Sequence, residues 1–342
     1  MANTPIRALL VGCGGICRAW LNSIKDCNLV QIAGLVDLNP ASMQKVADEY
    51  QFKVPQETDL TRALVAVQPD VVFDCTVPEA HVKVTLAALK HGCHVLGEKP
   101  LADSMANARR MVAACAKSGK LYAVIQNRRY LTPIRALRAF LDGGAIGRVT
   151  TVNADFYIGA HFGGFRDRMK HVLLLDMAIH SFDQARLIAG ADPVSVYCHE
   201  WNPAGSWYDH DASAQCIFAM TDGLVFNYRG SWCSEGLNTA WECQWRIVGE
   251  RGTVIWNGGN DLKCQRVVRP AGFNSELEDV AIPVACPPER DGGHRGVILE
   301  FLNCVRSGGT PETICRDNIK SLAMVFGAVR SAETGRRVPI KI

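Results

Sequence analysis

The chain has 342 residues, which is about the length of two average domains. Apolar residues make up 48% and charged residues 21%, so the composition is that of a globular protein and excludes a disordered chain. With 37 basic and 34 acidic residues the net charge is +3, which predicts no binding to nucleic acid or to an anionic membrane. No apolar run approaches the roughly 20 residues of a membrane-spanning helix, and the apolar start predicts a first strand instead of an export signal.

Cysteine is abundant, with 14 residues, but no two of them form a Cys-x-x-Cys pair. Without that spacing, a zinc site built from thiolates is not expected, and we predict no bound metal. A long chain without an export signal is typical of a reducing compartment. We therefore expect thiols, not disulfides, in a cytoplasmic protein.

The first third of the chain alternates short apolar runs with segments of helical spacing. The apolar runs lie at 6–11, 30–36, 71–76, 94–97 and 121–125. The helical segments lie at 18–26, 41–49, 58–67, 81–91 and 104–118. This alternation predicts a parallel sheet with helices on both faces, which is an α/β Rossmann-type domain over residues 1–125.

The pattern changes after residue 125. A helix is expected at 133–142, a strand at 149–157 and a helix at 174–188. Alternating strands separated by turns then run from 194 to 268, and the chain ends in a helix at 317–334 and a strand at 337–341. We predict that residues 126–342 form an α+β substrate-binding and oligomerisation domain with an open-faced, largely antiparallel sheet. Packing of the C-terminal helix against the first domain is an alternative that the sequence leaves open.

A glycine-rich turn connects the first expected strand to the first expected helix. Its first glycine permits a tight turn, and its second lets the backbone approach a pyrophosphate at the positive end of the helix. The third position usually holds Gly or Ala for close packing, and here it is Cys17. We expect the cofactor to contact Gly12, Cys13, Gly14, Gly15 and Ile16.

An acidic residue, Asp37, ends the second expected strand. A carboxylate at this place accepts hydrogen bonds from the adenosine ribose and repels a 2′-phosphate. The next residues, Leu38 and Asn39, carry no cation that could hold such a phosphate. The sequence therefore predicts NAD as the cofactor instead of NADP.

Two further motifs indicate a family. The first is Gly97-Glu98-Lys99-Pro100, and the second is Asp176-x-x-x-His180. Together with the glycine-rich turn they resemble the Gfo/Idh/MocA family of sugar and inositol dehydrogenases, over essentially the whole chain. Lys170, His171 and Val172 depart from the small glycines that often precede the aspartate in that family, which bears on which sugar would fit.

The resemblance implies roles for these motifs. Lys99 would reach between nicotinamide and substrate, and Asp176 and His180 would face the substrate. The end of the fourth strand and the turn at Lys99 would contact the cofactor through Thr76, Pro78, His81 and Glu98. The sheet of the second domain often forms subunit contacts in this family, which implies a homo-oligomer, either a dimer or a tetramer.

The residues themselves lead to a compatible chemistry. Asp176 and His180 are four positions apart in an apolar helical stretch, so both project from one face. Two ionisable groups on a buried helix are costly unless they are satisfied or functional. Oxidation of an alcohol needs a base, which suits histidine, and a donor that stabilises charge on oxygen, which suits Lys99. Whether Lys99 or His180 takes the proton stays open.

Several cations precede Asp176 in the chain or lie at the domain boundary. Arg166, Arg168 and Arg128 could hold an anionic group of a substrate, since guanidinium groups match oxyanions in a bidentate manner. Alternatively, they are surface cations that pair with nearby acids.

The aromatic residues likewise have two interpretations, either contact with the substrate or a purely structural role. His161 lies in a glycine-rich loop and is expected to line the substrate pocket. Five tryptophans could stack on sugar rings or serve only as sheet and interface residues. They are Trp201, Trp207, Trp232, Trp241 and Trp245.

Three functions are compatible with these motifs. The first is an NAD-dependent dehydrogenase that oxidises a secondary hydroxyl of a sugar, sugar derivative or inositol. The second is a redox glycosidase, in which NAD is reduced and reoxidised in one turnover while a glycosidic bond is eliminated. The third is a non-catalytic NAD-sensing protein, against which the joint presence of Lys99, Asp176 and His180 argues.

Overall fold

The computed structural model describes residues 4–270, 272–286 and 292–342. These residues form two compact units. The first contains residues 4–127 and 292–322, and the second contains residues 128–286 and 323–342.

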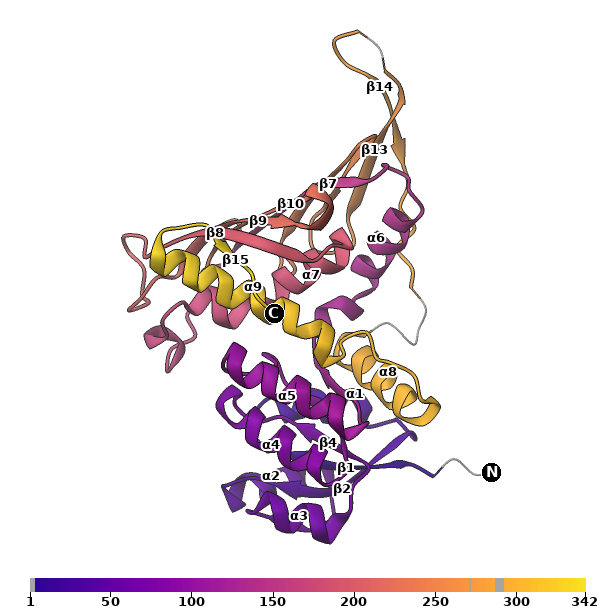
Figure 1. Cartoon of the computed structure of the whole chain (residues 1–342), viewed down its shortest axis with the longest axis vertical. Coiled ribbons are helices and arrows are strands. Elements are labelled where there is room, and N and C mark those ends of the chain that lie inside the picture. The colour runs from indigo at the N-terminus through magenta and orange to yellow at the C-terminus, as the bar shows by residue number, and fades with distance from the viewer. Residues whose placement is uncertain (1–3, 271, 287–291) are drawn as a thin grey trace. The chain divides into compact units, whose positions relative to one another are not determined.

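The first unit is built on a six-stranded sheet in the order β3-β2-β1-β4-β5-β6 (Figure 1). Every pair in it is parallel. The strands are β1 (Ile6–Val11), β2 (Val30–Val36), β3 (Gln56–Glu57), β4 (Val71–Asp74), β5 (His94–Gly97) and β6 (Tyr122–Val124). The helices are α1 (Cys17–Ile24), α2 (Pro40–Tyr50), α3 (Leu60–Val67), α4 (Pro78–Lys90), α5 (Met105–Ser118) and α8 (His294–Ser307).

Local sequence explains these elements. The central strands β1, β4 and β5 are almost wholly buried, as expected of parallel strands covered on both faces. Three helices begin at residues whose side-chain oxygens accept a backbone N–H of the first turn. These residues are Asn39, Asp59 and Ser104. The predicted Rossmann-type fold is confirmed.

The first unit also includes a segment from much later in the chain. The expected domain boundary at 125/126 lies next to the end of this unit's first segment at Asn127, but residues 292–322 group with the first unit instead of the second. Helix α8 packs on α1, and Arg295 donates to the carbonyl of Ser23 over 2.9 Å. The backbone N–H of Val124 donates to the carbonyl of Thr313 at the edge of the sheet.

The second unit is built on a nine-stranded sheet in the order β14-β13-β12-β11-β7-β10-β9-β8-β15 (Figure 1). Strands β7 and β10 run parallel, and every other pair that the structure describes is antiparallel. The strands are β7 (Val149–Tyr157), β8 (Pro193–Trp201), β9 (Ser213–Met220), β10 (Val225–Ser231), β11 (Gln244–Gly249), β12 (Gly252–Trp256), β13 (Leu262–Arg269), β14 (Glu276–Val280) and β15 (Val338–Pro339). The predicted open, largely antiparallel sheet is confirmed.

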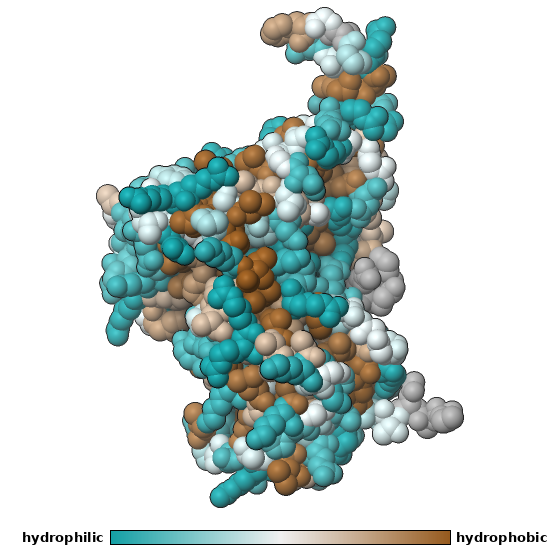
Figure 2. All heavy atoms as spheres, viewed as in Figure 1, coloured by the Kyte–Doolittle hydropathy of each residue, from teal (hydrophilic) through white to brown (hydrophobic). Residues whose placement is uncertain are grey.

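Helices cover one face of this sheet and leave the other open. They are α6 (Thr132–Asp142), α7 (Ile179–Ala189) and most of α9 (Cys315–Thr334). Strand residues alternate accordingly, so that Phe218 and Phe226 are buried under the helices while Ile217 is exposed on the open side. Strands β13 and β14 extend beyond the rest of the sheet as a hairpin, where apolar side chains gather among polar ones (Figure 2).

Two further observations concern the whole of the described chain. None of its helices is long and apolar enough to cross a membrane. Its fourteen cysteines are thiols, and no disulfide joins any two of them in the described residues. Cys198 and Cys216 lie opposite each other on β8 and β9 with their sulfur atoms 3.3 Å apart.

Candidate active site

The glycine-rich turn lies where the order of the sheet reverses, between β1 and β4. Gly12 has φ +91°, and a Cβ there would lie 2.6 Å from the carbonyl oxygen of Cys75 at the end of β4. Only glycine fits this close approach of two loops. A Cβ on Gly14 or Gly15 would meet nothing within 4 Å, so the space above the N-terminus of α1 is open. These residues fit the pyrophosphate of a dinucleotide.

The cysteines of this turn are packing residues. Cys17 is fully buried and its thiol donates to the carbonyl of Gly14 over 3.0 Å. Burial raises the pKa of Cys13 to about 12, so this thiol stays neutral near pH 7. The substitution of the third glycine by Cys17 is therefore tolerated as a small apolar contact.

Asp37 is fixed at the mouth of the turn. Its Oδ2 accepts the backbone N–H of Cys13 over 2.7 Å, and its Oδ1 accepts that of Asn39 over 2.8 Å. The neighbouring Leu38 is 88% exposed and brings no charge. A carboxylate held at this position suits the free ribose hydroxyls of NAD.

The turn that carries Lys99 is anchored through its neighbour Glu98. The Glu98 carboxylate is buried and accepts the indole N–H of Trp20 over 2.6 Å and the backbone N–H of Lys99 over 3.1 Å. Burial raises the pKa of Glu98, and these two hydrogen bonds and nearby positive charge act against that rise. The side chain of Glu98 thus faces the interior and binds the backbone of Lys99, and its contact with the cofactor stays a prediction.

The end of β4 is organised by Asp74. Its Oδ1 accepts both the backbone N–H of Thr76, over 3.1 Å, and the Thr76 hydroxyl, over 2.5 Å. Pro78 begins α4, where a proline is favoured. His81 is 1% exposed, and its two ring nitrogens face the carbonyl oxygens of Thr76 and Pro100. The ring of His81 therefore contacts backbone, and not the open side of the turn where a cofactor contact was expected.

In the second unit, Asp176 lies in a π-helix, Leu173–Ala178, that continues into α7. π-Helical turns inside helices are often found at functional sites. Arg166 binds the carboxylate of Asp176 in a bidentate manner, with its Nε 2.8 Å from Oδ2 and its Nη2 3.3 Å from Oδ1. His180 lies one turn later, in the first turn of α7, and is almost wholly buried. The spacing of Asp176 and His180 on one buried helix is as the sequence indicates.

The cations near Asp176 differ in their surroundings. The guanidinium of Arg166 lies over the ring of Phe162, at 4.9 Å, and over that of Phe165, at 4.8 Å. Its edge is occupied by Asp176, so its charge is already compensated within the protein. Arg168 is exposed to solvent. The arrangement does not leave Arg166 available as the main anchor of a substrate anion.

Arg128 is the third expected substrate cation, and it is also engaged. Its Nη1 donates to the carbonyl of Trp241 and lies 3.8 Å from the carboxylate of Glu242, while its Nη2 lies 3.5 Å from the sulfur of Met177. Burial lowers the pKa of Arg128, although a guanidinium keeps its charge near pH 7.

Aromatic rings connect these ion pairs into one continuous set of contacts. Phe162 packs edge-on against Trp232 at 5.1 Å, and Trp232 packs against Trp241 at 5.6 Å. Arg128 contacts the backbone of Trp241 and the side chain of Met177, which directly follows Asp176 in the chain. The set of contacts therefore begins and ends on the helix that carries Asp176. Phe162, Phe165 and Trp241 keep 43%, 67% and 46% of their surface exposed. Of the tryptophans left with two interpretations, Trp241 thus combines exposure with a contact to Arg128, which in turn contacts Met177.

His161 stands at the edge of this region. Its ring stacks on that of Trp207 at 3.7 Å, and its Nε2 lies 2.7 Å from the carboxylate of Glu235. The side chain is largely exposed, so it can still line a pocket. Glu235 was not identified from the sequence, because it lies in a loop with no recognisable motif.

A buried ion pair joins α7, the helix that carries His180, to the segment before α6. The Nε of Arg129 lies 2.5 Å from Oδ2 of Asp183, and both side chains are almost wholly buried. The sequence did not single out this pair. A charged residue one turn after His180 was the only available signal.

Two family models match this chain. The description "Oxidoreductase family, NAD-binding Rossmann fold" covers residues 6–126, and "GFO/IDH/MocA C-terminal domain" covers residues 134–255. The chain belongs to the GFO/IDH/MocA family. It is an NAD-binding oxidoreductase, in agreement with the predicted cofactor.

Relatives and solved structures match this family member over nearly its full length. A D-apiose dehydrogenase of Rhizobium rhizogenes is 27% identical over 99% of this chain and 99% of its own. An inositol 2-dehydrogenase of Rhizobium meliloti is 27% identical over 98% and 99%. An oxidoreductase from Agrobacterium radiobacter, solved with NAD⁺, L-tartaric acid and magnesium, has a TM-score of 0.86 at 24% identity, over 98% and 99%. This last likeness shows a shared fold.

Proposed function

We propose that this protein is an NAD-dependent dehydrogenase that oxidises a secondary hydroxyl of a sugar, sugar derivative or inositol. The observation that carries the proposal is the Asp176 carboxylate, held by Arg166 beside exposed aromatic rings on the helix that also bears His180. A carboxylate accepts hydrogen bonds from hydroxyls, and aromatic faces cover the apolar faces of sugar rings. D-apiose and inositol, named for the two relatives, are polyhydroxylated substrates of this kind.

The residues divide the work as follows. NAD, when bound, accepts the hydride from the carbon that is oxidised. His180 takes the hydroxyl proton as general base. Lys99 donates a hydrogen bond to the same oxygen and stabilises its developing negative charge. Asp176 orients the substrate through its other hydroxyls.

The ion pairs favour a substrate that is neutral. Arg166 is compensated by Asp176, and Arg128 lies beside Glu242 and a backbone carbonyl. Among the expected substrate cations of the second unit, this leaves the exposed Arg168 for an anionic group. We therefore replace the expectation of an anion held by Arg166 with that of a neutral polyol.

The exposed rings favour the redox glycosidase as a second candidate. Phe162 and Phe165, which lie on the guanidinium that binds Asp176, offer an exposed apolar surface that a substituent of a glycoside could cover. The two candidates differ in their products. A dehydrogenase produces NADH and a keto sugar, whereas a redox glycosidase releases the cleaved sugar without net formation of NADH.

A substrate screen tests both candidates. Purified protein with NAD is mixed with neutral sugars, inositols, glycosides and sugar acids, and the absorbance of NADH and the cleavage of glycosides are followed. We expect NADH from at least one neutral member. If neither NADH nor cleavage is detected with any member, while NAD binds, the proposed function is wrong.

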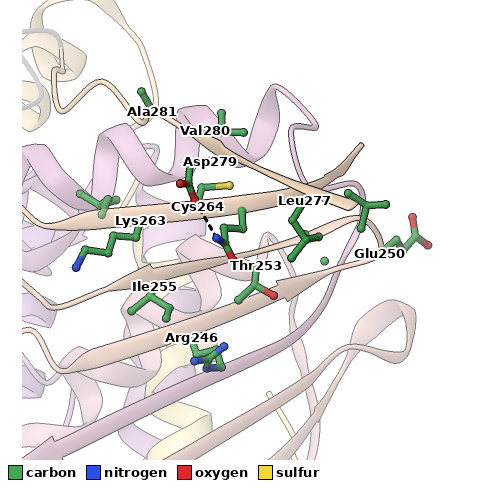
Figure 3. Close-up of a pocket in the computed structure, with 15 residues that line it drawn as sticks. Arg246, Glu250, Thr253, Ile255, Lys263, Cys264, Leu277, Asp279, Val280 and Ala281 are labelled. Carbon is green, nitrogen blue, oxygen red and sulfur yellow. Dashed lines mark hydrogen bonds between the residues drawn. The ribbon is translucent and has the colours of Figure 1, made fainter. Parts of the chain in front are cut away.

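We also propose a homo-oligomer, a dimer or tetramer, formed through the open face of the second unit's sheet. Over β11–β14 this face carries a shallow pocket with a volume of about 970 Å³ (Figure 3). Ile255 and Leu277 are exposed there, beside Lys263 and a hydrogen bond of 2.9 Å between Gln265 and Asp279. Apolar side chains interspersed with charges of both signs suit a second copy of the same surface.

Light scattering after size exclusion tests the oligomer. Ile255→Asp should convert it to smaller species, whereas Val65→Asp, at a more exposed position on α3 of the other unit, should not. An unchanged mass for Ile255→Asp would exclude this part of the face as an interface.

The thiols of Cys198 and Cys216 are close enough to be oxidised with little movement, so we propose that the protein works in the reducing cytoplasm.

A further inference from the structure

The buried histidine of the first unit has an unusual hydrogen-bond environment. His81 lies in the first turn of α4 and is 1% exposed. Its Nδ1 is 2.9 Å from the carbonyl oxygen of Pro100, and its Nε2 is 3.1 Å from the carbonyl oxygen of Thr76. Both of the groups that the ring faces are therefore acceptors.

A neutral imidazole cannot satisfy this arrangement. It has one N–H donor and one nitrogen lone pair, so one carbonyl oxygen would face a lone pair in the protein interior. An imidazolium has two N–H groups and donates to both oxygens. The contact geometry therefore selects the charged form of the ring.

A buried cation also needs compensating negative charge. Two buried carboxyl groups supply it, Asp74 at the end of β4 and Glu98 in the turn after β5. Asp74 Oδ2 is buried and has no hydrogen-bond partner among the described residues, so a nearby positive charge would stabilise the carboxylate form of Asp74. Burial raises the pKa of both carboxyl groups, and the charge of His81 is among the effects that lower it. Other titratable groups of this region include Lys99, the buried Cys75 next to Asp74, and the buried Tyr122 on β6.

We infer that His81 is a buried imidazolium that donates from both ring nitrogens and thereby ties the Thr76 turn to the Lys99–Pro100 turn. Since the Lys99 backbone is held on its other side by Glu98, the histidine and the glutamate together fix the position of Lys99. His81 is thus a positioning residue. Its effect on turnover rests on the proposed function, whereas its charge does not.

Nuclear magnetic resonance of protein labelled with ¹⁵N-histidine tests the charge without any substrate. The signals of His81 are assigned by their loss in His81→Gln. We expect both ring nitrogens of His81 to carry protons in the folded protein, because each faces a carbonyl oxygen. His91, exposed at the end of the same helix, is the comparison, because only its Nδ1 faces a carbonyl oxygen and its ring is not held by two acceptors. One protonated and one unprotonated nitrogen in His81 would overturn the inference.

Kinetics test the positioning role. His81→Gln should lower kcat about 10- to 100-fold, because a small displacement of a reacting group is costly, and should change KM less than about twofold. Val84→Ala, a buried change on the same helix that leaves both turns intact, should keep kcat near wild type. Equal losses of kcat in the two variants would show that His81 acts only through stability. A charged His81 in a protein that is inactive on every sugar would contradict the proposed function but not the charge of His81. If His81→Gln does not fold, the ring signals of His81 are assigned in the wild-type protein through their correlation with its backbone.

Discussion

In the first unit, the groups expected at the cofactor are fixed by backbone contacts and by side chains that are almost wholly buried. In the second unit, the groups expected at the substrate are fixed by ion pairs and aromatic rings that remain partly exposed. Trp20, Glu98 and His81 belong to the first kind, and Arg166 and Phe165 to the second. The difference suits a protein in which buried contacts hold the cofactor side rigidly while exposed loop residues meet the substrate.

The largest effect is expected from His180→Ala. Loss of a general base should lower kcat by a factor on the order of 10²–10⁴ near pH 7. The loss should shrink as pH rises, because the hydroxyl then needs less help to lose its proton. NAD affinity should stay at the wild-type value. Near-normal turnover of His180→Ala at pH 7 would instead assign the proton transfer to Lys99. The kcat of Asp176→Asn should lie between those of His180→Ala and wild type.

A smaller effect is expected from Arg166→Ala. It leaves the Asp176 carboxylate without its bidentate partner, which should lower kcat/KM about 10- to 100-fold, as expected for loss of a charged hydrogen bond. Arg168→Ala is the matched control, since Arg168 is exposed, and it should have little effect. If instead Arg166→Ala weakens only acidic substrates, Arg166 binds an anion and the neutral-substrate interpretation is wrong.

The cofactor side can be tested through Asp37. Asp37→Ser combined with Leu38→Arg removes the carboxylate that repels a 2′-phosphate and adds a cation at an exposed position. The ratio of kcat/KM for NADP to that for NAD should rise by about tenfold or more, which corresponds to about 1.4 kcal/mol. Equal use of both cofactors by the wild type would contradict the role given to Asp37.

The smallest effect concerns the stability of the second unit. His171 lies just before the π-helix, with its Nδ1 2.5 Å from Glu200, and this hydrogen bond raises the pKa of His171 above the ordinary value of 6.5. The stabilisation is complete below that ordinary value and is lost as pH rises through the raised one. The Tm advantage of wild type over His171→Gln should therefore fall as pH rises from 6.5, by roughly 2–4 °C. An advantage independent of pH would show that His171 stabilises the protein without its charge.

The cofactor side was predictable because its signals are local in the chain. Gly12 and Asp37 follow directly from strand, turn and helix patterns. The pairing of Arg166 with Asp176 was not, because it joins a loop to a π-helix whose geometry the apolar pattern does not encode. Strand β14 was also missed, since its residues are exposed on both faces and do not alternate. The grouping of α8 with the first unit depends on contacts between distant segments, such as Arg295 with Ser23.

The central claim is that a secondary hydroxyl of a neutral sugar-like molecule is oxidised with NAD. The most direct measurement uses the best substrate of the screen with deuterium on the carbon that becomes the ketone, and mass spectrometry of both products. The account predicts one deuterium in each NADH formed and one equivalent of keto sugar. NADH without deuterium, or cleavage of a glycoside with no net NADH, would contradict it.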